Sequence, residues 1–155
     1  MVDQPVTAQS PSSQISVELS SRNTGMAFQR TRLSAERTLM SVIRTALSLI
    51  SFGFTITQFF VHLKTENLLP ISSEAPRRFG ISLVILGATI LAFGIWYHAD
   101  FMLGLRKERR RMTEQGLIHG ESRYPVSVTF IVAVLLLLVA LLTTASLIFH
   151  IGPYE

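Results

Sequence analysis

The stretch RTRLSAERTLMSVIRTALSLI, residues 30–50, repeats its pattern every seven residues. An Arg-Thr pair opens each repeat, with the arginines at Arg30, Arg37 and Arg44, and a serine stands at the fifth place of each repeat. A seven-residue repeat advances by about 3.5 residues per turn, so its members lie along one face of a helix. The stretch therefore predicts a helix that carries arginine and serine along one side.

The polar face of this helix continues beyond the quoted stretch. Alternating steps of four and three residues meet only polar side chains, which we call the polar stripe: Arg30, Ser34, Arg37, Ser41, Arg44, Ser48, Ser51, Thr55, Gln58 and His62. Most other residues from 39 to 63 are Leu, Ile, Val or Phe, and the run is long enough to cross a bilayer. Lipid cannot hydrogen-bond polar groups, so the polar stripe must face protein or water.

Two further apolar runs are also long enough to cross a bilayer. Only 15% of the 155 residues are charged, whereas a soluble domain has about 25%. The sequence therefore predicts an all-α membrane protein with three transmembrane helices, over residues 39–63, 79–99 and 126–149.

The chain before the first span is predicted in two parts. Residues 1–25 are rich in Ser, Pro, Gln and Thr and are expected to form a disordered tail. The membrane domain then covers residues 26–155, and its first helix extends beyond the first span at the cytoplasmic end.

Basic residues concentrate on one predicted side of the membrane. They precede the first span and follow the second span, and they are fewer in the loop between these two spans. The positive-inside rule therefore places the N-terminus in the cytoplasm and the C-terminus outside. The cluster RKERRR, Arg106–Arg111, either attracts anionic lipid headgroups or only fixes the topology on a solvated helix. No nucleic-acid recognition module accompanies this charge, so we expect no nucleic-acid partner.

The arginines of the polar stripe leave two interpretations open. The stripe is either a seam in which small Ser and Thr residues allow helices to approach, with arginines that snorkel or form ion pairs, or it is a basic lining accessible to water. Asp100, at the cytoplasmic end of the second span, is the candidate counter-ion for Arg37 or Arg44. Glu36 lies off the stripe and is expected to pair locally with Arg32, four residues earlier.

Glycines repeat every seven residues in the second span, at Gly80, Gly87 and Gly94. A groove of glycines allows a neighbouring helix to approach closely, and packing is favoured over a hinge.

No catalytic or metal-binding pattern is visible. The chain has no cysteine, and its four histidines are predicted to lie in pairs at opposite membrane faces. No phosphate-binding glycine loop or Ser-His-Asp arrangement can be assembled. We therefore expect no enzymatic activity, no metal and no cofactor.

The run LSAERTLMSVIRTALSLISFGF, residues 33–54, resembles the YidH-like membrane proteins, classed as domain of unknown function 202. Their first span has a similar L-A-x-E-R-T-x-L-A-x-x-R-T-A-L-x-L-I-x-F-G pattern. The matching residues here are Leu33, Glu36, Arg37, Thr38, Arg44, Thr45, Ala46, Leu47, Ile50, Phe52 and Gly53. Met40 and Val42 depart from the usual residues. The resemblance covers roughly residues 25–105 and implies a multi-pass protein of the inner membrane with no defined activity.

The same domain is similar to the membrane part of the vacuolar transporter chaperone complex. In that complex, first-span helices of several subunits surround a channel lined by basic residues that passes polyphosphate. The shared E-R-T-x-x-S core corresponds to Glu36, Arg37, Thr38 and Ser41. This chain has no polymerase domain, so the resemblance implies at most a similar pore geometry.

Two hypotheses for function follow. In the first, copies of the chain form a homo-oligomer whose first helices meet around a basic axis. The stripe residues of that axis then line a pathway for an anion or a phosphate-type ion: Arg30, Arg37, Ser41, Arg44, Ser48 and Gln58. In the second, the chain is an accessory or scaffold protein whose stripe docks on another membrane protein or on anionic lipid.

Overall fold

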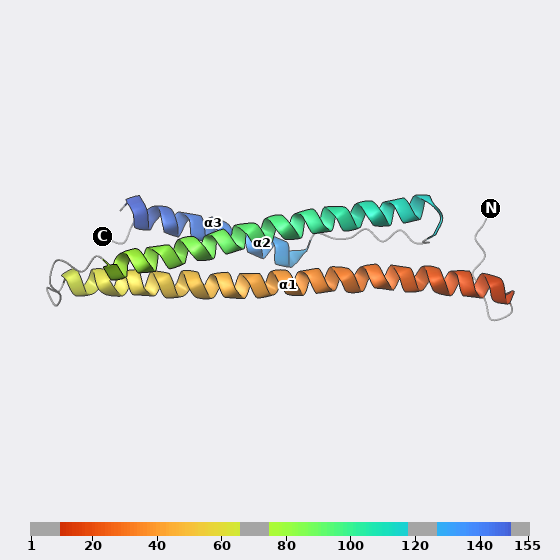
Figure 1. The fold of residues 1–155 in the computed structure, drawn as a ribbon, viewed down its shortest axis with the longest axis horizontal. Helices are drawn as coiled ribbons and strands as arrows, with labels where there is room; N and C mark the ends of the chain where they lie inside the picture. The colour runs from red at the N-terminus through yellow and green to blue at the C-terminus, as the bar shows by residue number, and fades with distance from the viewer. Residues whose placement is uncertain (1–9, 66–74, 118–126, 150–155) are drawn as a thin grey trace. The chain divides into compact units, whose positions relative to one another are not determined.

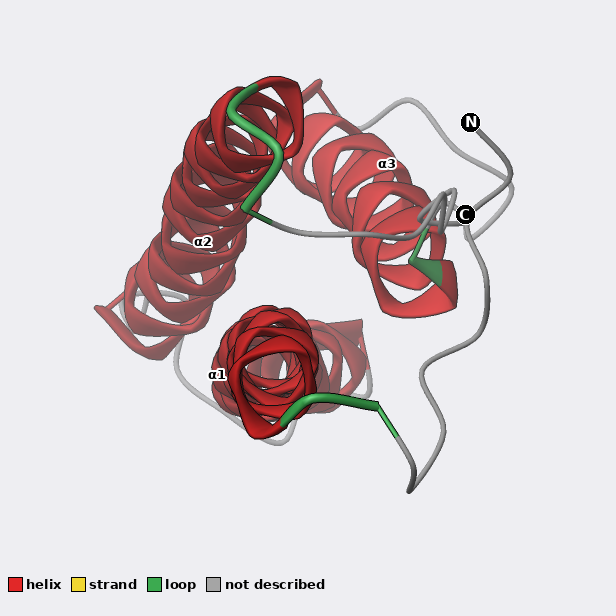
Figure 2. Cartoon of the chain, turned by 90° about the vertical axis from the view of Figure 1, so that its right-hand side faces the viewer, coloured by secondary structure: helices red, strands yellow, loops and turns green. Residues whose placement is uncertain are grey.

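A computed structural model describes residues 10–65, 75–117 and 127–149 of the chain (Figure 1). Three helices account for nearly all of these residues: α1, Ser12–Thr65, α2, Ala75–Glu114, and α3, Val128–Phe149. Each helix is long and apolar enough to cross a membrane, and the described residues contain no strand (Figure 2). The prediction of an all-α protein with three membrane-length helices is confirmed.

Helix α1 begins earlier than the sequence predicts. It starts at Ser12, where the backbone N–H groups of Gln14 and Ile15 donate to the Pro11 carbonyl oxygen at 2.9 and 3.2 Å. Arg22 and Glu18 form an ion pair one turn apart, with Nε and Oε1 at 2.7 Å. Residues 12–25 are therefore helical. The prediction of a disordered tail is wrong for these residues, because their polar composition conceals a helical pattern. Residues 1–9 lie outside the described residues.

Helix α2 also exceeds its predicted span and ends at a glycine. Gly116 has a φ of 71°, a left-handed conformation that favours glycine because other residues carry a Cβ. The N–H of Gly116 donates to Thr113 and that of Leu117 donates to Met112, each at 3.0 Å. These two bonds form a Schellman motif, which stops the helix.

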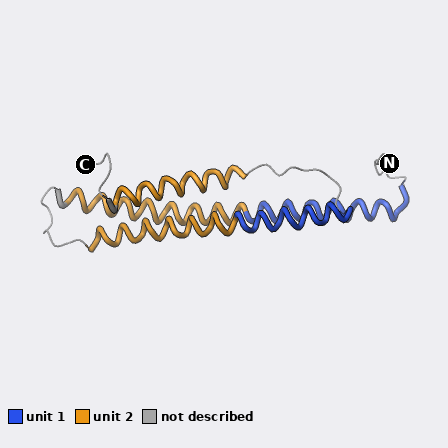
Figure 3. Tube along the Cα trace, turned by 90° about the horizontal axis from the view of Figure 1, so that it is seen from above, with its two compact units in different colours: residues 1–35, 99–125 blue, residues 36–98, 126–155 orange. Residues whose placement is uncertain are grey.

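The chain divides into two compact units, which are described separately below (Figure 3). Unit 1 contains residues 1–35 and 99–125, and unit 2 contains residues 36–98 and 126–155.

Unit 2 has a small core in which all three helices take part. Leu39, Ile43 and Ala46 of α1 pack with Leu91 of α2 and Ala133 of α3. Partly buried Ile95, Leu136 and Leu137 pack against this cluster. Most other large apolar side chains of unit 2 are exposed, as expected where the surrounding solvent is lipid.

Candidate functional site

Helix α1 carries two seven-residue repeats with different chemistry. One is the polar stripe, and the other is a row of packed residues that we call the packing seam: Leu39, Ile43, Ala46, Ile50, Gly53 and Thr57. Each member of the packing seam follows a member of the polar stripe by two residues. Two residues correspond to about 200° around an α-helix, so the two rows lie on opposite faces.

The packing seam faces the rest of unit 2, and the polar stripe does not. Every member of the packing seam is buried except Ile50, which is half-buried. Every member of the polar stripe is exposed except Gln58, which is half-buried. Among the residues described, the polar stripe is therefore not the contact between α1 and the other helices of its own chain.

Gly80 and Gly87 of α2 lie against the packing seam, and Gly94 lies against Val42, which neighbours the seam on α1. A Cβ added to Gly87 would lie 2.8 Å from Ile50 Cγ1 and 2.9 Å from the Ala46 carbonyl oxygen. A Cβ added to Gly94 would lie 2.5 Å from Val42 Cγ1. These separations are shorter than normal van der Waals contacts, so a larger residue would have to move the α1 backbone at Gly87 and the Val42 side chain at Gly94.

At the other end of the glycine repeat, α1 contributes its own glycine. A Cβ added to Gly53 would lie 2.5 Å from the Gly80 carbonyl oxygen, and one added to Gly80 would overlap Thr57 Oγ1. Thr57 is buried, and its hydroxyl donates to the Gly53 carbonyl oxygen at 2.8 Å, so its donor is satisfied inside the contact. Gly80 and Gly87 thus hold two helix backbones close together, and Gly94 gives room for the Val42 side chain.

The register of these contacts gives the depth of the arginines. Gly94, Gly87 and Gly80 meet Val42, Ile50 and Thr57 in that order, so α1 and α2 run antiparallel in unit 2.

Trp96 and Tyr97 follow Gly94 and are both exposed, as in the aromatic belt of a membrane interface. With Gly94 opposite Val42, Tyr97 is level with about Leu39. Arg37 then lies near the interface, and Arg44 lies five residues beyond Leu39, which is about 7.5 Å deeper along the helix.

The hydroxyl groups of the polar stripe partly satisfy themselves. Ser48 Oγ donates to the Arg44 carbonyl oxygen at 2.9 Å, and Thr55 Oγ1 donates to the Ser51 carbonyl oxygen at 2.8 Å. A hydroxyl bonded in this way keeps acceptor capacity but needs no external acceptor. The arginine guanidinium groups are therefore the groups on this face that most need an acceptor or a counter-ion.

Within the described part of unit 2, Glu36 is the only carboxylate. It precedes Arg44 by eight residues, about 12 Å along the helix. Asp100 belongs to unit 1 and is exposed. Its pairing with Arg37 or Arg44 stays a prediction, as does the pairing of Glu36 with Arg32.

One buried polar side chain was not recognised from the sequence as a packing residue. His98 is buried at the end of the α2 segment in unit 2, and its ring stacks on Phe130 of α3 with centroids 6.1 Å apart. A histidine after an apolar run gives no sequence signal for such a contact. The described residues contain no group of three or more metal-ligating side chains, and His119 and His150 lie outside them.

The basic cluster Arg106–Arg111 is partly paired within its own helix. Arg110 Nε lies 3.0 Å from Glu114 Oε1, and Arg111 Nη1 lies 3.9 Å from Glu108 Oε2. These exposed pairs contribute little to stability. The cluster begins nine residues after Tyr97, about 13 Å along the helix, so its attraction to lipid headgroups stays a prediction.

Comparison with known families supports the membrane assignment. The family model described as Domain of unknown function (DUF202) matches residues 30–103. The match contains the polar stripe of α1 and the glycine repeat of α2, and it supports the DUF202 family. No curated protein and no solved structure matches the chain. With three membrane-length helices, the chain is a small integral membrane protein with multiple membrane passes.

Proposed function

We propose that this protein forms a homo-oligomer in the inner membrane, in which the α1 helices of several copies surround an axis lined by the polar stripe. The axis is a pathway for small anions. The N-terminus and the Arg106–Arg111 cluster lie on the cytoplasmic side, in keeping with the positive-inside rule. The YidH-like resemblance of the first span supports the inner membrane as the location.

One observation supports this proposal above the others: the polar stripe lies on the face of α1 opposite to the packing seam. A row of polar side chains about five helical turns long is costly when it faces hydrocarbon. The other two helices of the same chain pack on the opposite face, so they do not cover it. Symmetric copies of α1 remove the whole row from lipid at once.

The charge of the polar stripe selects anions. Arg37 and Arg44 supply rings of guanidinium groups in such an assembly, and none of the three predicted spans contains a carboxylate. Rings of arginine attract anions and exclude cations in narrow pores. The resemblance to the vacuolar transporter chaperone membrane domain supports the same arrangement.

The depth of Arg44 favours a second candidate function. Side chains on a helix lean toward its N-terminus, which here is the cytoplasmic side. An arginine about 7.5 Å below the interface can extend to lipid phosphates by snorkelling. In that case the chain is a scaffold that docks a partner membrane protein or anionic lipid through the polar stripe, without transport.

A reconstitution experiment separates the two functions. We expect purified protein in liposomes to form a ring of several copies and to pass chloride. Arg44→Ala should lower the flux about tenfold or more without changing the assembly, because one guanidinium ring is lost, whereas Arg44→Lys keeps much of the flux. Arg110→Ala is the matched control, since Arg110 lies outside the stripe and pairs with Glu114.

A monomer or tight dimer without chloride flux would overturn the pathway. Saturable binding of the same preparation to vesicles rich in anionic lipid would then support docking.

A further inference from the structure

Beside the polar stripe, α1 carries a third row of residues with a seven-residue spacing. Every member is a large apolar residue, and we call the row the apolar line: Leu19, Met26, Leu33, Met40, Leu47, Phe54 and Val61. Six of them are between 43% and 55% exposed, and Phe54 is half-buried. The polar stripe and the packing seam leave this row unexplained.

Part of the apolar line lies outside any bilayer core. A helix needs about 20 residues to cross the hydrocarbon, and α1 has 54. The surplus falls in residues 12–35, which include the charged Glu18, Arg22, Arg30 and Arg32. Lipid tails therefore cannot explain the exposure of Leu19, Met26 and Leu33.

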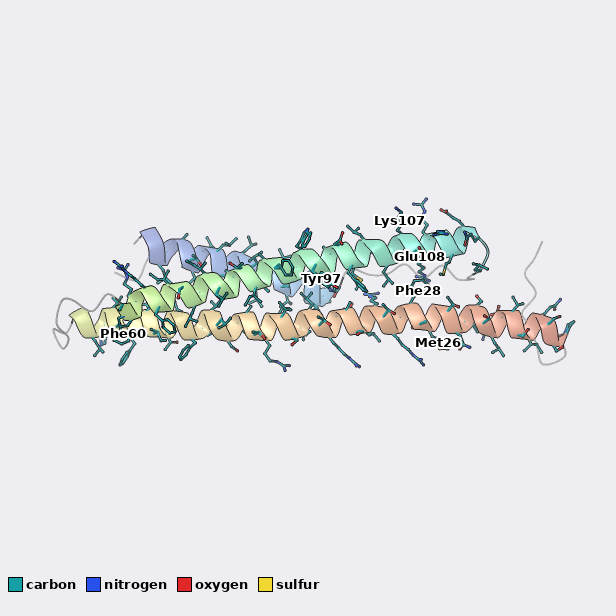
Figure 4. All side chains as sticks on the ribbon, viewed as in Figure 1. Met26, Phe28, Phe60, Tyr97, Lys107 and Glu108 are labelled. Atoms are coloured by element: carbon teal, nitrogen blue, oxygen red, sulfur yellow. The ribbon has the colours of Figure 1, made fainter. Side chains whose placement is uncertain are left out.

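Within unit 1, the apolar line also lies on the side of α1 that faces away from α2. Figure 4 shows Phe28 projecting from α1 toward α2 and Met26 projecting to the opposite side. Ser21 is buried and Met26 is exposed. Large apolar side chains that recur every seven residues on an exposed helix face are typical of a coiled-coil contact.

The other edge of the outward face has a different composition. It consists of β-branched and aromatic residues, which we call the β-branched flank: Val17, Thr24, Thr31, Thr38, Thr45, Phe52 and Phe59. The hydroxyls of Thr24, Thr31 and Thr45 donate to carbonyl oxygens one turn earlier, at 2.9, 2.9 and 3.1 Å. Their donors are satisfied, so an apolar neighbour can cover this flank without leaving a donor unpaired.

The arginines lie between these two edges. The β-branched flank follows each arginine by one residue, about 100° to one side, and the apolar line follows it by three residues, about 60° to the other side. The two edges differ in size and shape. A contact that joins unlike edges of identical chains is heterologous, and it closes into a ring when the rotation permits.

We infer that the apolar line of one copy packs in parallel on the β-branched flank of the next copy, from Leu19 outside the membrane to Val61. The inference rests on the proposed function and names the contact that builds its ring. An unmatched partner helix drifts by about 20° per heptad relative to a strict seven-residue repeat. A second α1 has the same repeat over the same length, which identifies the occupant as another copy of this chain. The arginines then face the ring axis.

Cysteine cross-linking tests this contact directly, because the chain contains no cysteine. The double variant Leu33→Cys/Thr31→Cys places one thiol on each edge, outside the membrane span. Oxidation in native membranes should give a ladder of dimers, trimers and larger species that ends at the ring. Leu33→Cys alone and Thr31→Cys alone should stay uncross-linked, because each thiol meets a residue that is not cysteine. Leu33→Cys/Leu103→Cys, with the second thiol on an exposed position of α2, is the matched control.

Two outcomes overturn the inference. Dimers from Leu33→Cys alone indicate a symmetric contact of the apolar line with itself, and an absent ladder in the double variant indicates a different interface. The cysteine-free protein shows whether a failed cross-link overturns only this contact or also the proposed function. If it forms a conducting ring while the ladder is absent, only this inference fails. If it is monomeric and conducts nothing, the proposed function fails with it.

Discussion

The two opposite faces of α1 use one seven-residue spacing for two purposes. The packing seam holds small or apolar side chains, such as Ala46 and Gly53, and lies against the glycines of α2. The polar stripe, displaced by two residues, holds arginine and serine and is exposed. The packing seam thus makes the close backbone contacts, and the polar stripe carries the charge. The difference indicates that the packing of the single chain is complete without the polar residues.

The largest expected effect comes from a bulky residue on the packing side. In Gly87→Leu, the new side chain overlaps Ile50 and the Ala46 carbonyl oxygen, and a helix backbone must move. We expect a loss of about 3 kcal/mol in the free energy of unfolding, at the upper end of typical overpacking costs. Unfolding by sodium dodecyl sulfate in mixed micelles measures this loss.

Gly104→Ala is the control for this variant. A Cβ at Gly104 meets no atom within 4 Å, and alanine favours a helix over glycine. Its stability should be unchanged or slightly higher. Equal destabilisation by both variants would contradict the account of the packing seam.

A smaller effect separates two threonines on the opposite faces. Thr57 is buried and donates to Gly53, whereas Thr55 is exposed and donates to Ser51. Thr57→Val removes a hydrogen bond inside the contact and should cost about 1 kcal/mol. Thr55→Val should change the stability of the single chain by less than about 0.5 kcal/mol, as surface substitutions do. The same micelle titration compares them, and a larger loss for Thr55→Val would reverse the assignment of the two faces.

The sequence predicts the polar stripe because its period is visible in polar residues alone. It does not show that the stripe faces away from the other helices, because small serines are equally suited to a seam. The sequence does not reveal the packing seam, because Ala46, Gly53 and Thr57 differ in hydropathy. The glycine repeat points to close packing, but only the register with Val42 and Ile50 gives its partner and the depth of Arg44.

The early part of α1 shows a second limit of prediction. Serine and glutamine before residue 25 favour a disordered tail by composition, whereas the apolar line begins at Leu19 and continues at the same spacing through the span. Overall composition does not reveal an apolar row whose members are seven residues apart and are separated by polar residues.

Access of water to the polar stripe decides whether α1 lines an aqueous pathway. Ser48→Cys lies one turn beyond Arg44 on the exposed face, and Leu138→Cys lies on an exposed apolar face of α3. In intact membranes, an anionic, water-soluble thiol reagent should modify Ser48→Cys rapidly and leave Leu138→Cys unmodified, because the first faces a water-filled axis and the second faces lipid. Equal protection of both thiols from the reagent would contradict an aqueous pathway along α1.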